Sequence, residues 1–143
     1  MVRWVIFSGV ASGLFLGLFF KGIEMTSGIK LYTLLLNIDF LTERVFPELI
    51  EFIFHCFVSI ILVAVVFFVV KRKKWRNIQI IYFTTGINLL IGGMIYPITI
   101  LSDRTPELTS FIAIILWLIG HGLYGFILGV FFIFYRKKTL VNV

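Results

Sequence analysis

The sequence predicts an all-α fold, an integral membrane four-helix bundle that occupies residues 1–143 as a single domain. The chain has 143 residues, of which 60% are hydrophobic and only 14% are charged, whereas a soluble domain carries about a quarter charged residues. Its mean hydropathy is +1.08. A core this small cannot hide so much apolar surface from water, so part of the surrounding solvent must be lipid.

Four apolar runs supply the helices, and each is close to the ~20 residues that cross a hydrocarbon layer of about 30 Å. Backbone groups in lipid must be satisfied internally, and runs of this length achieve that as helices rather than as barrel strands. The first run begins like a secretory signal, but no small-x-small cleavage site follows closely, so we expect a retained helix. The predicted spans lie at about 4–20, 50–70, 78–101 and 111–135.

The charged residues set the predicted direction of the spans. All seven acidic residues lie in the connections 21–49 and 102–110 or at the adjoining helix ends. Nine of the thirteen basic residues lie at the opposite helix ends, namely Arg3 and the membrane anchors Lys71, Arg72, Lys73, Lys74, Arg76, Arg136, Lys137 and Lys138. The positive-inside rule therefore places both termini and the 71–77 turn in the cytoplasm, and the lipid bilayer is the expected partner.

Two function classes are excluded by charge and cysteine content. The net charge of +6 comes from residues beside the spans, so it indicates membrane topology and no nucleic-acid partner. The single cysteine, Cys56, excludes an intrachain disulfide and a cysteine-based metal cluster. The chain also contains no nucleophile elbow, no phosphate-binding glycine loop and no pair of catalytic carboxylates in a span, so the sequence favours a protein that is not an enzyme.

The connection 21–49 is long for a chain of this size and contains its own apolar patch. That patch is too short to span, but it can lie in the interface or re-enter the membrane. We expect this external loop to pack over the outer end of the bundle, either as a fixed cap or as a lid that opens.

An internal repeat is one interpretation of two similar segments. PELIEFI at 47–53 matches PELTSFI at 106–112 in five of seven positions, and each precedes a span that ends in basic residues. A parallel repeat of two spans plus two spans would follow. The alternative is simple helix chemistry, since proline and an acidic residue are both favoured where a helix begins.

Each span carries one stripe of polar or small residues at helical spacing, which predicts that the stripes face inward. The glycines allow helices to approach closely, either inside the bundle or at a dimer seam, and they are Gly9, Gly13, Gly17, Gly125 and Gly129. The polar stripe of the first span comprises Ser8 and Ser12, and that of the second comprises Glu48, Glu51, His55 and Ser59. The stripe of the third span comprises Thr85, Asn88, Gly92, Tyr96 and Thr99, and that of the fourth comprises Trp117, His121, Tyr124, Gly125 and Leu128.

The two histidines are expected at nearly the same depth. His55 is 16 residues before Lys71, and His121 is 15 residues before Arg136. At ~1.5 Å per residue both imidazoles lie about 22–24 Å from the cytoplasmic charges, in the outer third of the hydrocarbon. The sequence therefore predicts a polar cluster in the outer half of the bundle.

Ionisable residues inside a membrane are costly enough to be functional candidates by default. The principal hypothesis is a cluster that binds a small ligand, an ion or a partner, formed by Glu51, His55, Asn88, Tyr96, His121 and Tyr124. A proton or ion path through Glu51, His55 and His121 is one form of it, and a pocket for a lipid or other apolar ligand at the outer leaflet is another. The competing interpretation is that each histidine is a structural group with its hydrogen bonds satisfied inside the bundle.

Two further alternatives involve a cofactor or a complex. A divalent metal would use Glu51, His55 and His121, because three protein ligands and a water form the common catalytic zinc site. Haem would use His55 and His121 as two axial ligands at one level. The last alternative is an accessory or immunity-type subunit of a larger membrane complex, or a homo-oligomer, in which the glycine faces carry the contact.

The segments WLIGHGLYGFILG (117–129), LYTLLLNIDF (31–40) and PELIEFIFH (47–55) resemble small uncharacterised four-span membrane proteins of Bacillus-type bacteria. The resemblance runs along most of the chain, and the Ile, Phe and Lys usage agrees with a low-GC genome. It implies a bacterial plasma-membrane protein. It implies no particular activity and carries over no catalytic residues.

Overall fold

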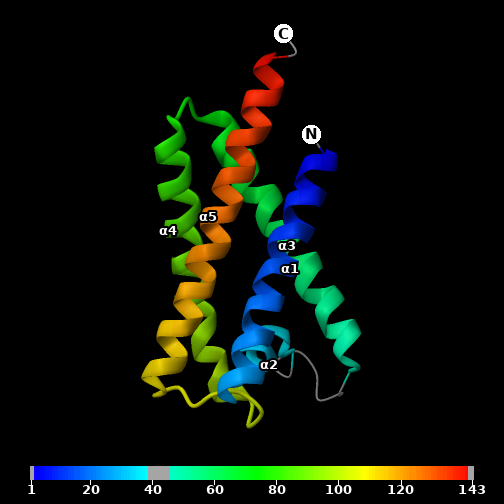
Figure 1. Cartoon of the computed structure of the whole chain (residues 1–143), viewed down its shortest axis with the longest axis vertical. Helices are drawn as coiled ribbons and strands as arrows, with labels where there is room; N and C mark the ends of the chain where they lie inside the picture. Colours follow the sequence, from blue (N-terminus) through cyan, green and yellow to red (C-terminus); the bar gives the residue numbers. More distant parts are fainter. Residues whose placement is uncertain (1, 39–45, 142–143) are drawn as a thin grey trace.

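The computed structural model describes residues 2–38 and 46–141, with side chains as far as residue 138. All regular elements in these residues are helices, in agreement with the predicted all-α fold (Figure 1). They are α1 (Val2–Ser27), α2 (Leu31–Leu36), α3 (Glu48–Arg72), α4 (Asn77–Ile95), the 3₁₀ helix η1 (Tyr96–Leu101) and α5 (Phe111–Val141). Within this part of the chain four stretches are long and apolar enough to cross a membrane, namely α1, α3, α4 with η1, and α5.

The helices form two close pairs that meet through α1. α1 packs along α3, α4 packs along α5, and α1 also packs against α5. Among the described residues α3 and α4 make no extended contact, although the short turn 73–76 joins them. Both termini lie at the same end of the bundle as this turn, and α2 lies at the other end (Figure 1).

The third span differs from its prediction, because the sequence favoured one continuous helix over 78–101. The α-helix ends at Ile95, and the chain continues as the 3₁₀ helix η1 with Pro97 in its first turn. Proline has no N–H to donate and its ring crowds the preceding turn, so a regular α-helix does not continue through it. The tighter winding turns this end of the span toward the connection that leads to α5.

The first span is longer than predicted, because α1 continues to Ser27 instead of ending near residue 20. Gly28 ends it with a φ of +74°, and its N–H donates to the carbonyl of Glu24 at 2.9 Å. Glycine adopts this left-handed conformation at little cost, which is the usual way to finish a helix. The predicted loop 21–49 therefore begins with two further helical turns of α1.

The glycines of α1 form a packing face against α3. A Cβ added to Gly9 would lie 2.8 Å from Cα of Ile60, and one added to Gly17 would lie 2.5 Å from Cε2 of Phe52. Gly13 is similarly close to Ser59. Because the two helices touch where these side chains are missing, the α1 stripe serves packing inside the bundle and is not a dimer seam.

The glycines of α5 form the corresponding face against α4. A Cβ on Gly125 would meet the carbonyl oxygen of Thr84 at 2.5 Å, and a Cβ on Gly129 would meet Oγ1 of the same residue at 2.6 Å. Both predicted glycine faces are thus used within the chain. The sequence did not single out Thr84, which is fully buried and completes the inward stripe of α4.

The short helix α2 is held over one end of the bundle by α1. The Glu24 carboxylate accepts hydrogen bonds from the backbone N–H of Thr33 at 2.9 Å and from its hydroxyl at 2.7 Å. It thereby satisfies one free N–H at the start of α2. Leu31 and Leu34 of α2 are buried on the side of this helix that faces the bundle. α2 thus lies over this end of the bundle within the described part of loop 21–49, while residues 39–45 of that loop lie outside the described residues.

The two similar heptapeptides adopt different local structures. In PELIEFI, Pro47 is the N-cap and α3 begins at Glu48. In PELTSFI, Pro106 and Glu107 lie in the connection, and α5 begins only at Phe111. The match thus gives no structural support to the repeat of two spans plus two spans.

The basic anchors gather at the end of the bundle that carries the termini. Arg136 of α5 donates to the carbonyl oxygen of Trp75 at 2.5 Å and also to the side chain of Asn77. Lys138 lies over the ring of Trp4 at 5.8 Å. Arg136 therefore fastens α5 to the α3–α4 turn, a contact that the charge pattern alone did not indicate.

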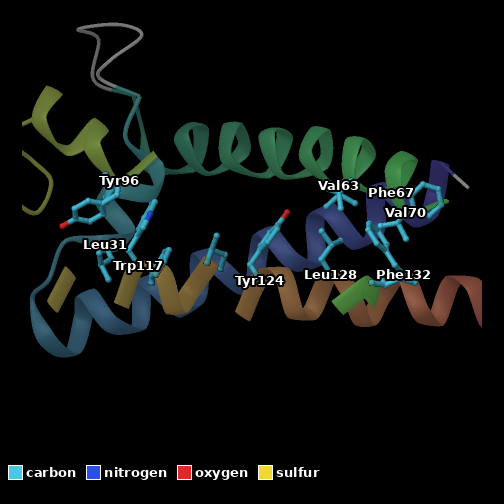
Figure 2. Close-up of a cluster of buried hydrophobic side chains, with 14 of the residues drawn as sticks. Leu31, Val63, Phe67, Val70, Tyr96, Trp117, Tyr124, Leu128 and Phe132 are labelled. Carbon is cyan, nitrogen blue, oxygen red and sulfur yellow. The ribbon is translucent and has the colours of Figure 1, made fainter. Parts of the chain in front are cut away.

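The buried hydrophobic side chains form one continuous core along the bundle, part of which Figure 2 shows. The part beside α2 contains Leu31, Tyr96 and Trp117. The part toward the termini contains Val63, Phe67, Val70, Leu128 and Phe132. Tyr124 lies between these parts and its hydroxyl points toward α3 (Figure 2). This middle region is where the polar side chains meet.

Candidate functional site

A cavity of about 320 Å³ occupies the middle of the bundle and its α2 end. Leu16 of α1 with Trp117, His121 and Tyr124 of α5 line one part of it, and α2 lines another part through Leu34, Leu35 and Leu36. α3 and α4 supply the remaining sides. The lining is predominantly apolar, with a few polar side chains among the hydrocarbon groups.

α3 and α4, which are joined at one end and separate toward the other (Figure 1), both contribute to the lining of the cavity. On α3 the lining residues Phe54 and Val58 are about half exposed, so this part of the lining reaches the outer surface of the bundle. On α4 the lining residues include Ile91 and Ile95. These are hydrocarbon side chains on membrane-capable helices.

His55 of α3 crosses to α1. Its Nε2 lies 3.1 Å from the carbonyl oxygen of Gly13. A carbonyl oxygen can only accept, so Nε2 carries the proton and donates it. A Cβ on Gly13 would lie 3.6 Å from Nε2, which is an ordinary contact distance, whereas it would lie only 3.1 Å from Cβ of Ser59. The glycine is therefore required by the close approach of Ser59, and its carbonyl receives the bond from His55.

His121 of α5 is held by its own helix and by α4. Its Nδ1 lies 3.0 Å from the carbonyl oxygen of Trp117, so in this ring Nδ1 is the donor. The ring packs directly onto Gly92, where an added Cβ would meet His121 Cγ at 2.6 Å. Trp117 donates from Nε1 to the Gly92 carbonyl at 2.8 Å and stacks on Phe20 with ring centroids 4.9 Å apart.

Tyr124 and Ser59 link α5 to α3. The Tyr124 hydroxyl lies 2.8 Å from Oγ of Ser59, and Ser59 Oγ donates to the carbonyl oxygen of Gly9 at 2.7 Å. Serine has one hydroxyl proton, and a carbonyl cannot donate, so the proton between the two hydroxyls belongs to Tyr124. The chain of bonds therefore runs from α5 through α3 to α1.

Asn88 of α4 is fully buried and lines the cavity. Its Nδ2 donates to the carbonyl oxygen of Thr84, one turn earlier, at 2.8 Å. That bond fixes the amide orientation, because the opposite orientation would set two acceptors against each other. Oδ1 then has no hydrogen-bond partner within the described residues. A buried acceptor without a partner is costly, so it is a notable feature of the site.

Glu51 lies at the α2 end of the cavity and is only 8% exposed. Its Oε1 is 3.7 Å from Nη2 of Arg104, in the connection between η1 and α5. Tyr96, the remaining member of the predicted cluster, does not line the cavity. Its hydroxyl donates to the carbonyl oxygen of Glu107 at 3.1 Å, because the 3₁₀ turn directs this end of α4 toward that connection.

Five of the six predicted cluster residues therefore line one cavity, and Tyr96 does not. The two histidines share this cavity, but no ring contact between them occurs in the described part of the chain, since His55 faces α1 and His121 packs on α4. Nor do the described residues contain a group of three His, Cys, Asp or Glu side chains that could hold a metal ion. The structure therefore does not assemble Glu51, His55 and His121 into the predicted metal site.

A second polar group lies outside the cavity and ties α2 to the long helices. Lys21 Nζ pairs with Oε1 of Glu48 at 2.6 Å, and the Tyr32 hydroxyl donates to the same oxygen at 2.9 Å. Burial, followed by this bond to the carboxylate, raises the pKa of Tyr32 above its usual value. These contacts hold one side of α2 in place over the cavity.

Comparison of the chain with known protein families, curated proteins and solved structures found no match. The cavity and the side chains that line it are therefore the basis for a functional argument.

Proposed function

We propose that this chain is a membrane protein that binds a lipid-like small molecule in the cavity between α3 and α4. The observation that carries the proposal is the cavity itself, about 320 Å³ in volume and lined by side chains of all four membrane-capable helices, among which Phe54 and Val58 of α3 are also exposed on the bundle surface. Small-molecule sites are commonly of about 300–1,000 Å³, mostly apolar, with a few polar groups that fix orientation. The side chains His55, Asn88 and His121 are such groups here.

The depth of these polar groups supports access from the bilayer. Asn88 and Tyr124 each lie 12 residues from the arginine at the basic end of their helix, and His55 lies 16 residues from Lys71. At ~1.5 Å per residue they are about 18–24 Å from the basic end of a hydrocarbon layer of about 30 Å. An opening at that depth faces lipid chains, so an apolar molecule reaches it without passing through water.

The orientation is part of the proposal. The end with the termini and the basic anchors lies in the cytoplasm of a bacterium, and the end with α2 and the acidic residues lies outside the plasma membrane. Two features support this direction: basic side chains concentrate at the end with both termini, and Glu24, Glu48 and Glu51 gather at the α2 end. The ligand then comes from the outer half of the bilayer.

The test uses Trp117 as a reporter, because this ring lines the cavity and is only 1% exposed. Trp4→Phe and Trp75→Phe leave Trp117 as the only tryptophan in the chain. The protein is placed in liposomes and titrated with ω-bromoundecanol, a single-chain alcohol whose bromine quenches indole fluorescence on close approach. We expect saturable quenching at a small mole fraction of the probe. Quenching that rises linearly with the probe, without saturation, would contradict the proposal.

A matched pair of substitutions separates the cavity from the lipid-facing surface. Val58→Phe narrows the opening, whereas Val65→Phe lies two helical turns further along α3, is equally exposed and does not line the cavity. Both replace an exposed valine in the middle of a helix, so both should fold. Val58→Phe should weaken saturable quenching severalfold and Val65→Phe should leave it unchanged. Equal effects of the two would mean that the probe quenches from the surface.

A further inference from the structure

Four of the polar side chains that line the cavity use a hydrogen-bond donor inside the protein. Tyr124 gives its proton to Ser59, and Ser59 gives its own to the carbonyl of Gly9. His55 and His121 each give one N–H to a backbone carbonyl, on Gly13 and Trp117 respectively. The bonds from Ser59, His55 and His121 end on carbonyl oxygens, so they cannot reverse, and the Tyr124 bond is fixed because Ser59 has already given its one proton to Gly9.

Three of the polar atoms that remain on His55, His121 and Asn88 are acceptors. In a neutral imidazole with one donating N–H, the other nitrogen carries a lone pair, which leaves Nδ1 of His55 and Nε2 of His121 as acceptors. Neither nitrogen has a partner among the described residues. Oδ1 of Asn88 is a third acceptor, buried and without a partner in the same part of the chain. Asn88 also retains a second amide N–H, which is a donor.

We propose that the ligand of this cavity is a single-chain amphiphile with a neutral hydroxyl head group, which donates its one hydrogen bond to an acceptor of the set formed by Asn88, His55 and His121. This inference rests on the proposed function, and it names the ligand class of that site. The hydroxyl proton satisfies one of the unpartnered acceptors, and the hydroxyl oxygen can accept from the second N–H of Asn88. The hydrocarbon chain of the amphiphile fills the apolar part of the cavity and leaves between α3 and α4.

Other head groups fit this set of atoms less well. A carboxylate has only acceptors, so it would bring a negative charge toward three acceptor atoms and the carboxyl group of Glu51. An ether or ester also lacks a donor. An ammonium group donates but cannot accept from Asn88, and its charge would have to leave water for a mostly apolar cavity. A neutral hydroxyl both donates and accepts, and it carries no charge into the membrane.

The experiment compares three probes that differ only at the head. ω-Bromoundecanol, its methyl ether and ω-bromoundecanoate are titrated into liposomes that contain the protein with Trp117 as the only tryptophan. We expect the alcohol to bind about fivefold or more tightly than the ether, because the ether leaves the buried acceptors unpaired. The carboxylate should bind at least as weakly as the ether. The Val65→Phe variant should show the same order of affinities.

Two variants assign the preference to named acceptors. Asn88→Leu removes the buried acceptor at similar volume, and we expect the alcohol-to-ether ratio to fall to within about twofold. Because Asn88 is fully buried and this variant can misfold, His55→Leu is the second test, at a half-buried ring. His55→Leu should lower the ratio while the ether still binds.

The outcomes separate the two proposals. If the alcohol and the ether both bind saturably with equal affinity, the hydroxyl inference is wrong while the lipid-like ligand remains supported. If the carboxylate binds most tightly, the inference is also wrong, and the histidines act as cations. If none of the three probes quenches saturably, the cavity is not a ligand site and the proposed function fails. A preference for the alcohol that Asn88→Leu and His55→Leu both leave intact contradicts the assignment to these acceptors.

Discussion

Gly125→Ala tests the contact that brings α4 and α5 together. An added Cβ at this position would lie 2.5 Å from the carbonyl oxygen of Thr84 and 2.7 Å from Cα of Thr85, both of which are backbone atoms of α4. A backbone atom in a helix cannot turn aside as a side chain can. Ordinary contact begins at 3.4 Å, so the two helices must separate locally by about 1 Å to accept one methyl group.

The expected cost follows from two opposing effects. Overpacking of a tight contact costs about 1–3 kcal/mol, and the better helix propensity of alanine returns at most about 1 kcal/mol. A net loss of about 1–2 kcal/mol corresponds to a fall in Tm of about 3–8 °C for a chain of this length. Gly125→Ala should also weaken probe binding, because the new methyl group would lie only 3.0 Å from Cβ of Asn88, which lines the cavity.

The assay is thermal unfolding in detergent, monitored by circular dichroism. The matched control is Gly122→Ala on the same helix, where the nearest atom to an added Cβ is Cδ2 of Leu89 at an ordinary 3.4 Å. Gly86→Ala on α4 is a second control, since nothing lies within 4 Å. Both controls should unfold at or above the temperature of the parent protein. If Gly125→Ala is as stable as Gly122→Ala, the close α4–α5 contact does not exist as described.

Three further predictions concern the other contacts. Gly9→Ala should lower Tm more than Gly17→Ala, because the first meets the Ile60 backbone and the second meets a phenyl ring that can shift; thermal unfolding decides, and the reverse order would contradict the packing. In a spectroscopic titration of tyrosinate, Glu48→Gln should lower the pKa of Tyr32. The pKa of Tyr32 in the folded state exceeds the ordinary value of about 10. The stabilisation that this bond gives the fold is therefore complete below about pH 10 and is lost as the pH rises through the folded-state pKa. An unchanged pKa of Tyr32 in Glu48→Gln would exclude the bond. A reporter fused to the carboxyl terminus should be cytoplasmic, and one inserted into the 102–110 connection should be outside; the opposite result would reverse the proposed orientation.

Helical spacing predicted the buried face of the first and fourth spans. Ser8 and Ser12, and the stripe from Trp117 to Leu128, are buried as expected, because burial in a bundle follows the 3.6-residue period. The prediction was wrong for Glu48 of the second stripe, which is exposed because it lies at the start of α3 and pairs with Lys21. Counting residues from the basic anchors gave His55 and His121 a common depth, and both line the same cavity.

The partners of these faces could not be predicted from the sequence. A glycine stripe permits close approach, but it does not indicate which helix approaches, and here Gly9 meets α3 whereas Gly125 meets α4. The tautomers of the histidines depend on which carbonyl lies opposite each ring, and that is a property of the packed bundle. Pro97 was visible in the sequence, and its effect on the end of the third span could have been anticipated.

The separation of α3 and α4 has a mechanical consequence. The two helices are connected only through a short turn at one end, and they are held at the other end by neighbours rather than by each other. α3 is 25 residues long, so it is a rigid arm of about 37 Å, and a rotation of about 5° at the turn displaces its far end by about 3 Å. The distance between the free ends of α3 and α4 therefore depends on the contacts of α1 with α3. If the proposed ligand enters between α3 and α4 and displaces α3, it must strain the glycine contacts of α1, which lie on the opposite side of α3.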